Sequence, residues 1–257
     1  MKKRKISRIG AVAMATVLTV QGMGIPTAVL AADKPAVMSS DSDTQMSSEK
    51  ENVYVNQYGS TTERSQNFDD NWRFYLGDAS GAEQPTFDDS QWRQLSLPHD
   101  YSIEQEYTQS GEAESAYLLG GTGWYRKNFT LDKAMEGKEV RLDFDGVYMN
   151  ATVYVNGHEV GTHPYGYTPF SFDITDYVKV GEVNTIAVKV DHKTPSSRWY
   201  SGSGIYRSVY LTTTDKVHVD LNGVKVETPD LAKGNQNTNI KTTVLNESDA
   251  EKAVTVT

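Results

Sequence analysis

Short runs in which hydrophobic and polar residues alternate fill most of the chain after Trp124. In Glu139–Asp145, for example, Val140, Leu142 and Phe144 are spaced two residues apart and would share one face of a strand. Further runs of this kind occur at 124–131, 151–160, 170–174 and 185–191. No hydrophobic repeat of about 3.6 residues persists over several helical turns. The pattern therefore predicts an all-β domain of short strands, built as a sandwich or a jelly roll.

Two connections between strands carry signals of their own. Asn156-Gly157 lies between alternating runs and predicts a tight hairpin, because both central residues of a type I′ turn need positive φ. Further upstream, Pro98 stops a regular strand, and an irregular polar run continues from there to about Gly123. A connection of this length is unusual and is more often functional than a short one.

The pattern changes after Thr214. Plainer alternating runs, interrupted by Gly, Pro and Asn, follow at 217–221, 224–227, 239–245 and 253–256. They are typical of the first strands of an immunoglobulin-like sandwich, a fold that needs about 100 residues. We therefore predict a first β domain at residues 61–214 and an incomplete immunoglobulin-like domain at residues 215–257.

The N-terminal region differs in composition from the rest. Residues 1–32 combine basic Lys2–Lys5, an apolar run from Ile9 to Val20 and small residues before Ala32, which is typical of a secretory signal peptide. The apolar run is short for a membrane span, and the alternative is an uncleaved anchor. Residues 33–60 begin with small, polar and charged side chains and are predicted to form a disordered linker. The mature protein is thus expected to be secreted or held at the cell surface.

Charge and cysteine content narrow the classes of partner. The formal net charge is −9, and removal of residues 1–31, which hold five basic and no acidic side chains, changes it to −14. A clearly acidic protein is a poor partner for nucleic acid or anionic membranes, so neither is expected. The chain has no cysteine, which excludes disulfides and thiolate metal sites. An exported chain without disulfides fits a Gram-positive bacterium better than a eukaryotic secretory pathway.

Three residues at strand ends or in loops are candidates for ligand contact. Asp100 and Asp191 each adjoin a histidine, in His99-Asp100 and Asp191-His192. A carboxylate there can accept two hydrogen bonds from neighbouring hydroxyls, which is what a sugar offers. The competing interpretation is a carboxylate that ties down its own loop. His99 is the third candidate.

Other polar residues have structural interpretations. Asp143 and Asp145 share one face of a strand and are expected on its solvated side. Asp69-Asp70 and Asp88-Asp89 adjoin turn-like segments, where aspartate caps backbone groups. The five histidines show no metal-ligand spacing, and neither a glycine-rich phosphate loop nor a nucleophile elbow occurs. No metal or cofactor is therefore expected.

The stretch Pro195–Arg207 combines glycines with aromatic rings. Gly202 and Gly204 separate the pair Trp199-Tyr200 from Tyr206, and glycine permits positive φ or a close approach of two backbones. Rings beside arginines also suit flat polar ligands. We interpret the stretch as a rigid corner between two strands, packed by its own rings.

Several of these segments, in this order, resemble the N-terminal sugar-binding domain of glycoside hydrolase family 2, which contains β-galactosidases, β-glucuronidases and β-mannosidases. Together they cover residues 65–212. The matching pieces are Trp72-Arg-Phe74, Leu97-Pro-His-Asp100, Gly123-Trp-Tyr-Arg-Lys127, Leu142-Asp-Phe-Asp-Gly146, Ala151–Gly157, Tyr165–Phe170, Phe172-Asp-Ile-Thr175 and Pro195–Arg207. The last piece is most similar to the bacterial, cell-surface β-galactosidase branch.

The resemblance implies an order of domains. A galactose-binding-like jelly roll at 61–214 would be followed by an immunoglobulin-like domain and then by a (β/α)8 barrel, which holds both catalytic glutamates of a retaining mechanism. The barrel lies outside this chain, so the chain alone is expected to be inactive and no catalytic residue is assigned. The resemblance also implies that Asp191, with Asp100 second, contacts a β-galactoside or other glycan in the barrel. Asp191-His192 departs from the Asp-Asn more usual there.

The leading prediction is therefore the N-terminal portion of an exported family 2 glycosidase, most similar to a β-galactosidase. An alternative is a free-standing carbohydrate-binding or adhesion module without hydrolytic activity. A further alternative is that the domain acts mainly as a packing scaffold for the barrel.

Overall fold

The computed structural model describes residues 55–59, 63–195, 201–234 and 237–255. The chain divides into two compact units, of which the larger contains residues 54–218 and 246–250. The predicted signal peptide and most of the predicted linker lie outside the described residues. Among the described residues, no helix is long and apolar enough to cross a membrane.

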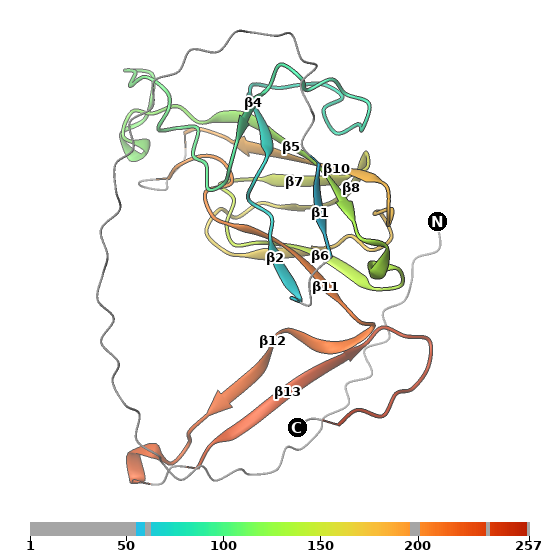
Figure 1. Cartoon of the computed structure of the whole chain (residues 1–257). Coiled ribbons are helices and arrows are strands. Elements are labelled where there is room, and N and C mark those ends of the chain that lie inside the picture. The colour runs from blue at the N-terminus through green and yellow to red at the C-terminus, as the bar shows by residue number, and fades with distance from the viewer. Residues whose placement is uncertain (1–54, 60–62, 196–200, 235–236, 256–257) are drawn as a thin grey trace, which may run out of the picture. The chain divides into compact units, whose positions relative to one another are not determined.

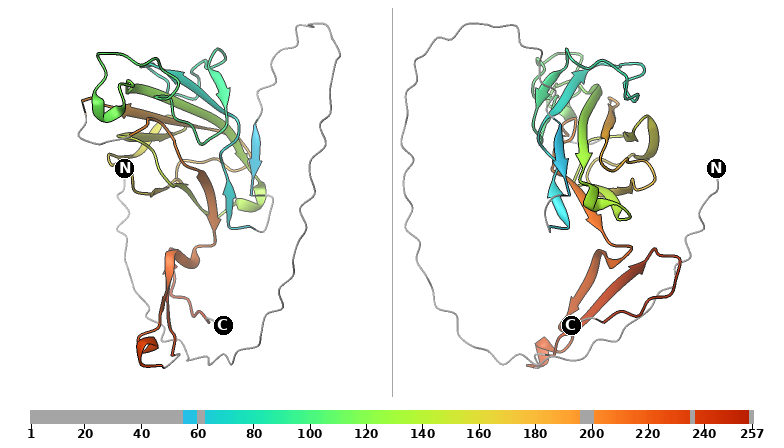
Figure 2. Two further views of the ribbon diagram at one scale, coloured as in Figure 1. Left: turned by 90° about the vertical axis from the view of Figure 1, so that its left-hand side faces the viewer. Right: turned by 45° about the vertical axis from the view of Figure 1, so that its right-hand side comes forward.

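The larger unit is a β-sandwich of two sheets (Figure 1, Figure 2). The first sheet contains β1 (Asn56–Tyr58), β3 (Trp72–Leu76), β4 (Arg93–Leu95), β5 (Gly121–Leu131), β7 (Ala151–Val155), β8 (His158–His163) and β10 (Val183–His192). The second contains β2 (Ser65–Asn67), β6 (Glu139–Phe144), β9 (Phe170–Asp173) and β11 (Val209–Thr214). The described helical elements are the short 3-10 turns η1 (Ala113–Ser115), η2 (Lys133–Met135) and, outside the larger unit, η3 (Leu231–Lys233). The predicted all-β jelly-roll class is confirmed.

The hydrophobic positions of the alternating runs are buried in the structure. In β6, Val140, Leu142 and Phe144 are buried while the residues between them are half-buried. β7 and β8 pair through the predicted hairpin, in which Asn156 and Gly157 have φ of 51° and 82°. Both values are positive, as a type I′ turn requires. The pleat places one face of each sheet on a shared hydrophobic core.

Strand β5 lies in the middle of the first sheet and is buried on both faces. β10 pairs with it from Val183 to His192. On the outer face Trp124 packs with Ala82 of the 77–92 loop, which covers this part of the sheet. The Arg126 side chain holds that loop in place: its Nε donates to Asp89 Oδ2 at 2.7 Å and its guanidinium donates to the carbonyl of Ala82.

The C-terminal end of the predicted disordered linker is wrong, because it contains strand β1. Residues 33–60 were predicted to be disordered, yet Asn56–Tyr58 pairs in parallel with Phe129–Leu131 of β5. The Tyr58 side chain is 6% exposed and packs against Phe68, with ring centroids 4.7 Å apart. The buried Tyr58 ring anchors the strand to the core. A strand of three residues is too short to show hydrophobic alternation in the sequence, so the pattern did not predict it.

The smaller unit contains a two-stranded sheet of β12 (Val217–Glu227) and β13 (Asn239–Asn246). The runs predicted as separate strands at 217–221 and 224–227 form one strand, β12. Asn222, which lies between the two runs, adopts a left-handed φ of 55°, but the strand continues through it. The run predicted at 253–256 forms no strand in its described part, 253–255. Val224, Val226 and Ile240 are more than half exposed.

Candidate functional site

Asp191 lies at the end of β10, next to the last paired residue, His192. Its backbone is held on both sides, because its N–H donates to Met149 O at 3.0 Å and its carbonyl accepts from Asn150 Nδ2 at 2.9 Å. The carboxylate stays 30% exposed and meets Lys193 Nζ at 3.3 Å and Thr122 Oγ1 at 3.4 Å. These contacts are long and Lys193 is mostly exposed, so the carboxylate can accept hydrogen bonds from a ligand's hydroxyls.

Asp100 has a different position, because its carboxylate ties two loops together. Its Oδ1 accepts from the backbone N–H of Ser102 at 2.9 Å and from that of Ser203 at 2.8 Å. A Cβ at Gly202 would collide with this carboxylate, so glycine is needed there. These two bonds agree with the competing interpretation, a carboxylate that ties down a loop. Contact of Asp100 with a sugar stays a prediction.

His99 is buried, with 9% of its surface exposed. Its Nδ1 lies 2.7 Å from the Tyr125 hydroxyl and its Nε2 lies 3.3 Å from Glu104 Oε1. Burial lowers the pKa of His99, and the nearby Glu104 carboxylate opposes that shift. The ring is therefore part of the buried packing beneath the loop, and its contact with a sugar stays a prediction.

A buried chain of hydroxyls connects the Asp100 loop with the end of β10. His192 Nδ1 lies 2.5 Å from Ser203 Oγ, which in turn contacts Ser102 Oγ. His192 is 1% exposed, its ring packs on Tyr148 at 4.9 Å between centroids, and burial lowers its pKa. Sequence reasoning missed Ser102 and Ser203, because two serines about 100 positions apart carry no local signal.

The corner at Pro195–Arg207 brings these groups together. Backbone bonds from His99 N to Ile205 O, at 2.8 Å, and from Tyr101 N to Ser203 O, at 2.9 Å, join it to the Asp100 loop. Tyr206 packs the corner through a hydroxyl bond to Gly166 O at 2.8 Å. Trp199 and Tyr200, also predicted to pack it, lie outside the described residues.

The remaining acidic candidates are structural, as predicted. On the outer face of β6, Asp143 accepts from Arg141 Nε at 2.7 Å and from Ser171 Oγ at 2.6 Å, while Asp145 is exposed. Asp69 accepts from the backbone N–H of Val209 at 2.7 Å. The described part of the chain contains no cluster of three or more His, Cys, Asp or Glu side chains that would hold a metal ion.

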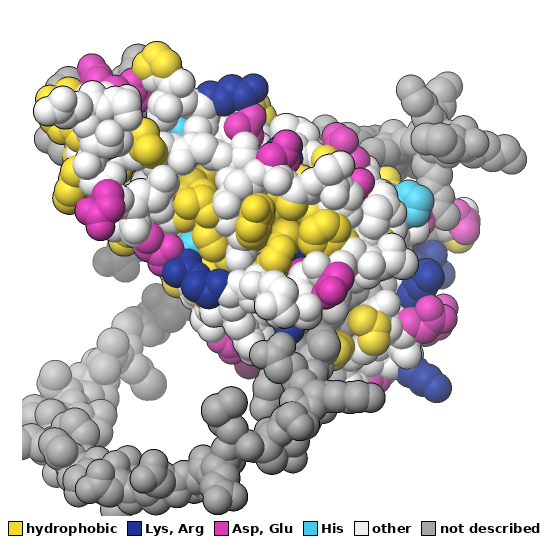
Figure 3. Space-filling view, turned by 90° about the horizontal axis from the view of Figure 1, so that it is seen from above, with side chains coloured by type: hydrophobic (Ala, Val, Ile, Leu, Met, Phe, Trp, Pro, Cys, Tyr) yellow, Lys and Arg dark blue, Asp and Glu magenta, His cyan; other side chains and the backbone are white. Residues whose placement is uncertain are grey.

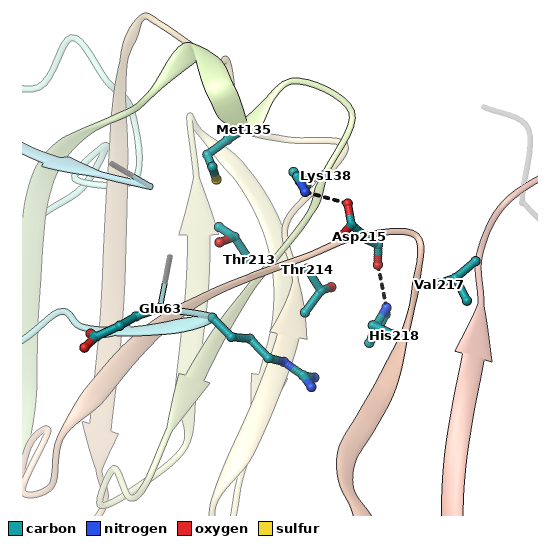
Figure 4. Close-up of a pocket in the computed structure, with 9 residues that line it drawn as sticks. Glu63, Met135, Lys138, Thr213, Thr214, Asp215, Val217 and His218 are labelled. Atoms are coloured by element: carbon teal, nitrogen blue, oxygen red, sulfur yellow. Dashed lines mark hydrogen bonds and ion pairs between the residues drawn. The ribbon is translucent and has the colours of Figure 1, made fainter. Parts of the chain in front are cut away.

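A hollow of about 420 Å³ lies near the start of β12 (Figure 4). Its ionic groups pair with one another: Lys138 Nζ meets Asp215 Oδ1 at 2.5 Å, and His218 Nδ1 lies 2.8 Å from the Asp215 carbonyl. The described lining contains no Tyr, Trp or Phe ring on which a sugar could stack.

Comparison with known proteins identifies the domain. Residues 65–215 match the family model described as glycosyl hydrolases family 2, sugar binding domain. The chain therefore belongs to glycoside hydrolase family 2, as the quoted motifs predict.

Relatives and solved structures agree with this assignment. The chain is 50% identical over 201 residues to the β-galactosidase BoGH2A of Bacteroides ovatus, which covers 77% of this chain and 23% of the relative. It is 44% identical over 170 residues to a putative β-glucuronidase of Formosa agariphila, covering 65% and 16%. A β-glycosidase structure from Bacteroides vulgatus matches with TM-score 0.67 and 38% identity, covering 73% of this chain and 25% of that one. The chain thus spans about a quarter or less of the length of these proteins.

Proposed function

We propose that this chain supplies the sugar-binding domain of an exported family 2 β-galactosidase, in which a retaining barrel carries the two catalytic carboxylates. In this arrangement the domain performs no bond cleavage. It contributes a polar edge that contacts a terminal β-galactoside. The similarity to a β-galactosidase at 50% identity favours this substrate over a glucuronide.

The proposal rests on the partly exposed carboxylate of Asp191. The Asp191 side chain is 30% exposed and accepts no backbone N–H, whereas Asp100 Oδ1 accepts two backbone hydrogen bonds and His99 is buried, among the described residues. A fixed backbone and an accessible carboxylate suit recognition of sugar hydroxyls, because the acceptor is already oriented before the ligand arrives. The basic and apolar N-terminal segment, typical of a signal peptide, supports export.

The test begins with the reading frame downstream of codon 257, which is expected to encode a barrel with two glutamates. In the enzyme that this frame encodes, we expect Asp191→Asn to lower kcat/KM on a nitrophenyl β-galactoside by about tenfold or more, because a lost contact to a substrate hydroxyl weakens transition-state binding. Asp145→Asn is the matched control, because Asp145 is exposed on another strand end; it is expected to change kcat/KM by less than about twofold.

Two results would overturn the proposal. Unchanged kcat/KM in Asp191→Asn would leave the domain as a packing scaffold. Absence of a barrel in the reading frame, together with saturable galactose binding by the chain alone, would make it a free-standing binding module. A nitrophenyl β-glucuronide, assayed in parallel, decides between the two substrate classes found among the relatives.

A further inference from the structure

A second groove, of about 400 Å³, opens on the edge of the first sheet where β4 begins, at Arg93. β4 pairs only with Trp72–Phe74 of β3, so Tyr75 and Leu76 continue beyond it without a β4 partner. The groove is bounded on one side by this free end of β3 and on the other by the loop that carries Glu104 and Gln105. Its size lies within the range of roughly 300–1,000 Å³ that is usual for small-molecule sites.

One wall of the groove is aromatic. Tyr75 stacks on Trp92 with ring centroids 5.4 Å apart and planes 21° apart, and Phe87 supports Trp92 edge-on at 5.4 Å. Tyr75 remains 42% exposed. A Cβ at Gly77 would lie 2.9 Å from the Tyr75 ring, so the absence of a side chain there lets the ring lie against the sheet edge.

The facing wall is polar. Arg93 Nη2 donates to both carboxylate oxygens of Glu104, at 3.0 and 2.7 Å, and the two side chains are 50% and 40% exposed. Gln105 Nε2 donates to the Leu119 carbonyl at 2.8 Å, which fixes the amide in place. Gln91, on the aromatic side, is exposed and makes no side-chain hydrogen bond to the described residues.

We propose that this groove binds a neutral sugar residue of a glycan. An exposed, supported ring offers a flat surface to the C–H face of a pyranose, and the polar wall offers donors and acceptors to its hydroxyls. The charges lining the groove, one Arg93 and one Glu104, cancel and are paired with each other. An anionic sugar would therefore gain no unpaired cation and would meet the Glu104 carboxylate, so a neutral sugar is favoured.

This inference goes beyond the proposed function, because the groove contains none of Asp100, Asp191 or His192. The two are therefore separable by mutation. A variant with Asp191→Asn is expected to keep sugar binding in the groove, and a variant of Tyr75 is expected to leave the Asp191 carboxylate in place.

The test is a titration of the full chain with lactose, followed by two-dimensional ¹H–¹⁵N NMR, with glucuronate as the anionic comparison. We expect saturable shifts of the Trp92 indole N–H and of the Leu76 amide. Tyr75→Ala is expected to weaken lactose binding by about tenfold or more, because the stacking surface is lost. Glucuronate is expected to bind more weakly than lactose.

Tyr107→Ala is the matched control, because Tyr107 is 74% exposed on the loop that carries Glu104 and has no ring partner among the described residues. This variant is expected to change affinity by less than about twofold. Gln91→Ala tests the polar part without touching the packing and is expected to weaken binding by about threefold. The inference is overturned if lactose causes no saturable shift up to about 100 mM, or if Tyr75→Ala binds lactose as the unchanged protein does.

Discussion

The amino group of Lys127 is buried beside aromatic residues of the hydrophobic core. The residue is 2% exposed, and its Nζ donates to the Tyr58 hydroxyl and to the Phe68 carbonyl, both at 2.7 Å. The Phe68 ring lies over it, with Nζ 3.7 Å from the centroid. Burial lowers the pKa of Lys127 to about 7, partly opposed by the carboxylates of Asp70 and Asp69. One side chain thus joins β1, the turn before β3 and the central strand β5.

The position of Lys127 predicts a pH-dependent stability. Because its folded pKa lies below the unfolded value of about 10.4, the unfolded chain binds more protons than the folded chain between pH 7 and pH 9, by up to one proton at the upper end. Stability therefore rises with pH in this window, by about 1.4 kcal/mol per pH unit at most. In Lys127→Met this contribution disappears. Urea unfolding at pH 7, 8 and 9 measures the difference between the two proteins; parallel stability curves would show that Lys127 does not titrate there.

The corner that precedes β11 requires glycine at position 204. Gly204 has a φ of 119°, and a Cβ there would lie 2.8 Å from the His99 carbonyl and closer still to the Tyr125 hydroxyl. Tyr148 exchanges backbone hydrogen bonds with Gly204, at 2.9 and 2.8 Å. Together with the backbone bonds from His99 and Tyr101, these bonds join the Asp100 loop to the segment before β7 through the corner.

Gly204→Ala is expected to destabilise the domain by about 3 kcal/mol or more, because left-handed strain and overpacking add. Gly137→Ala is the matched control: Gly137 has a φ of 76°, but a Cβ there would meet no atom within 4 Å. Only the strain of about 1 kcal/mol remains in that variant. Thermal melts compare the two, and equal losses of Tm would show that the close approach at the corner does not constrain the fold.

The same elements show how far sequence reasoning reaches. Alternation predicted strands such as β6, and Asn156-Gly157 predicted the β7–β8 hairpin, because strand pleat and turn geometry are local properties. Asp191 lies near the end of a strand, as the alternation predicted. The hydrogen bond from the Ser203 N–H to Asp100 could not be predicted, because Ser203 lies 103 positions away and only the folded corner brings the two together.

At the scale of the whole chain, the two units differ in how they bury apolar surface. In the sandwich, Val153 and Val155 of the β7–β8 hairpin are fully buried in the core. In the β12–β13 sheet, Val224, Val226 and Ile240 are between 51% and 59% exposed. Two strands without a packed face are marginally stable in water, so this sheet has little to hold it closed.

The two units should therefore differ in the rates at which their backbone amides exchange hydrogen. Backbone amides of β12 and β13 are expected to exchange at least about 100-fold faster than those of β7 and β8, because local opening of an uncovered sheet exposes little additional apolar surface. The β7–β8 hairpin is the matched comparison, since it is also an antiparallel strand pair but has one face on the core. Exchange of the full chain, measured by mass spectrometry on peptides from both pairs, gives the ratio directly. Equal protection of the two pairs would mean that the apolar face of the β12–β13 sheet is covered in solution, for example by a second copy of the chain.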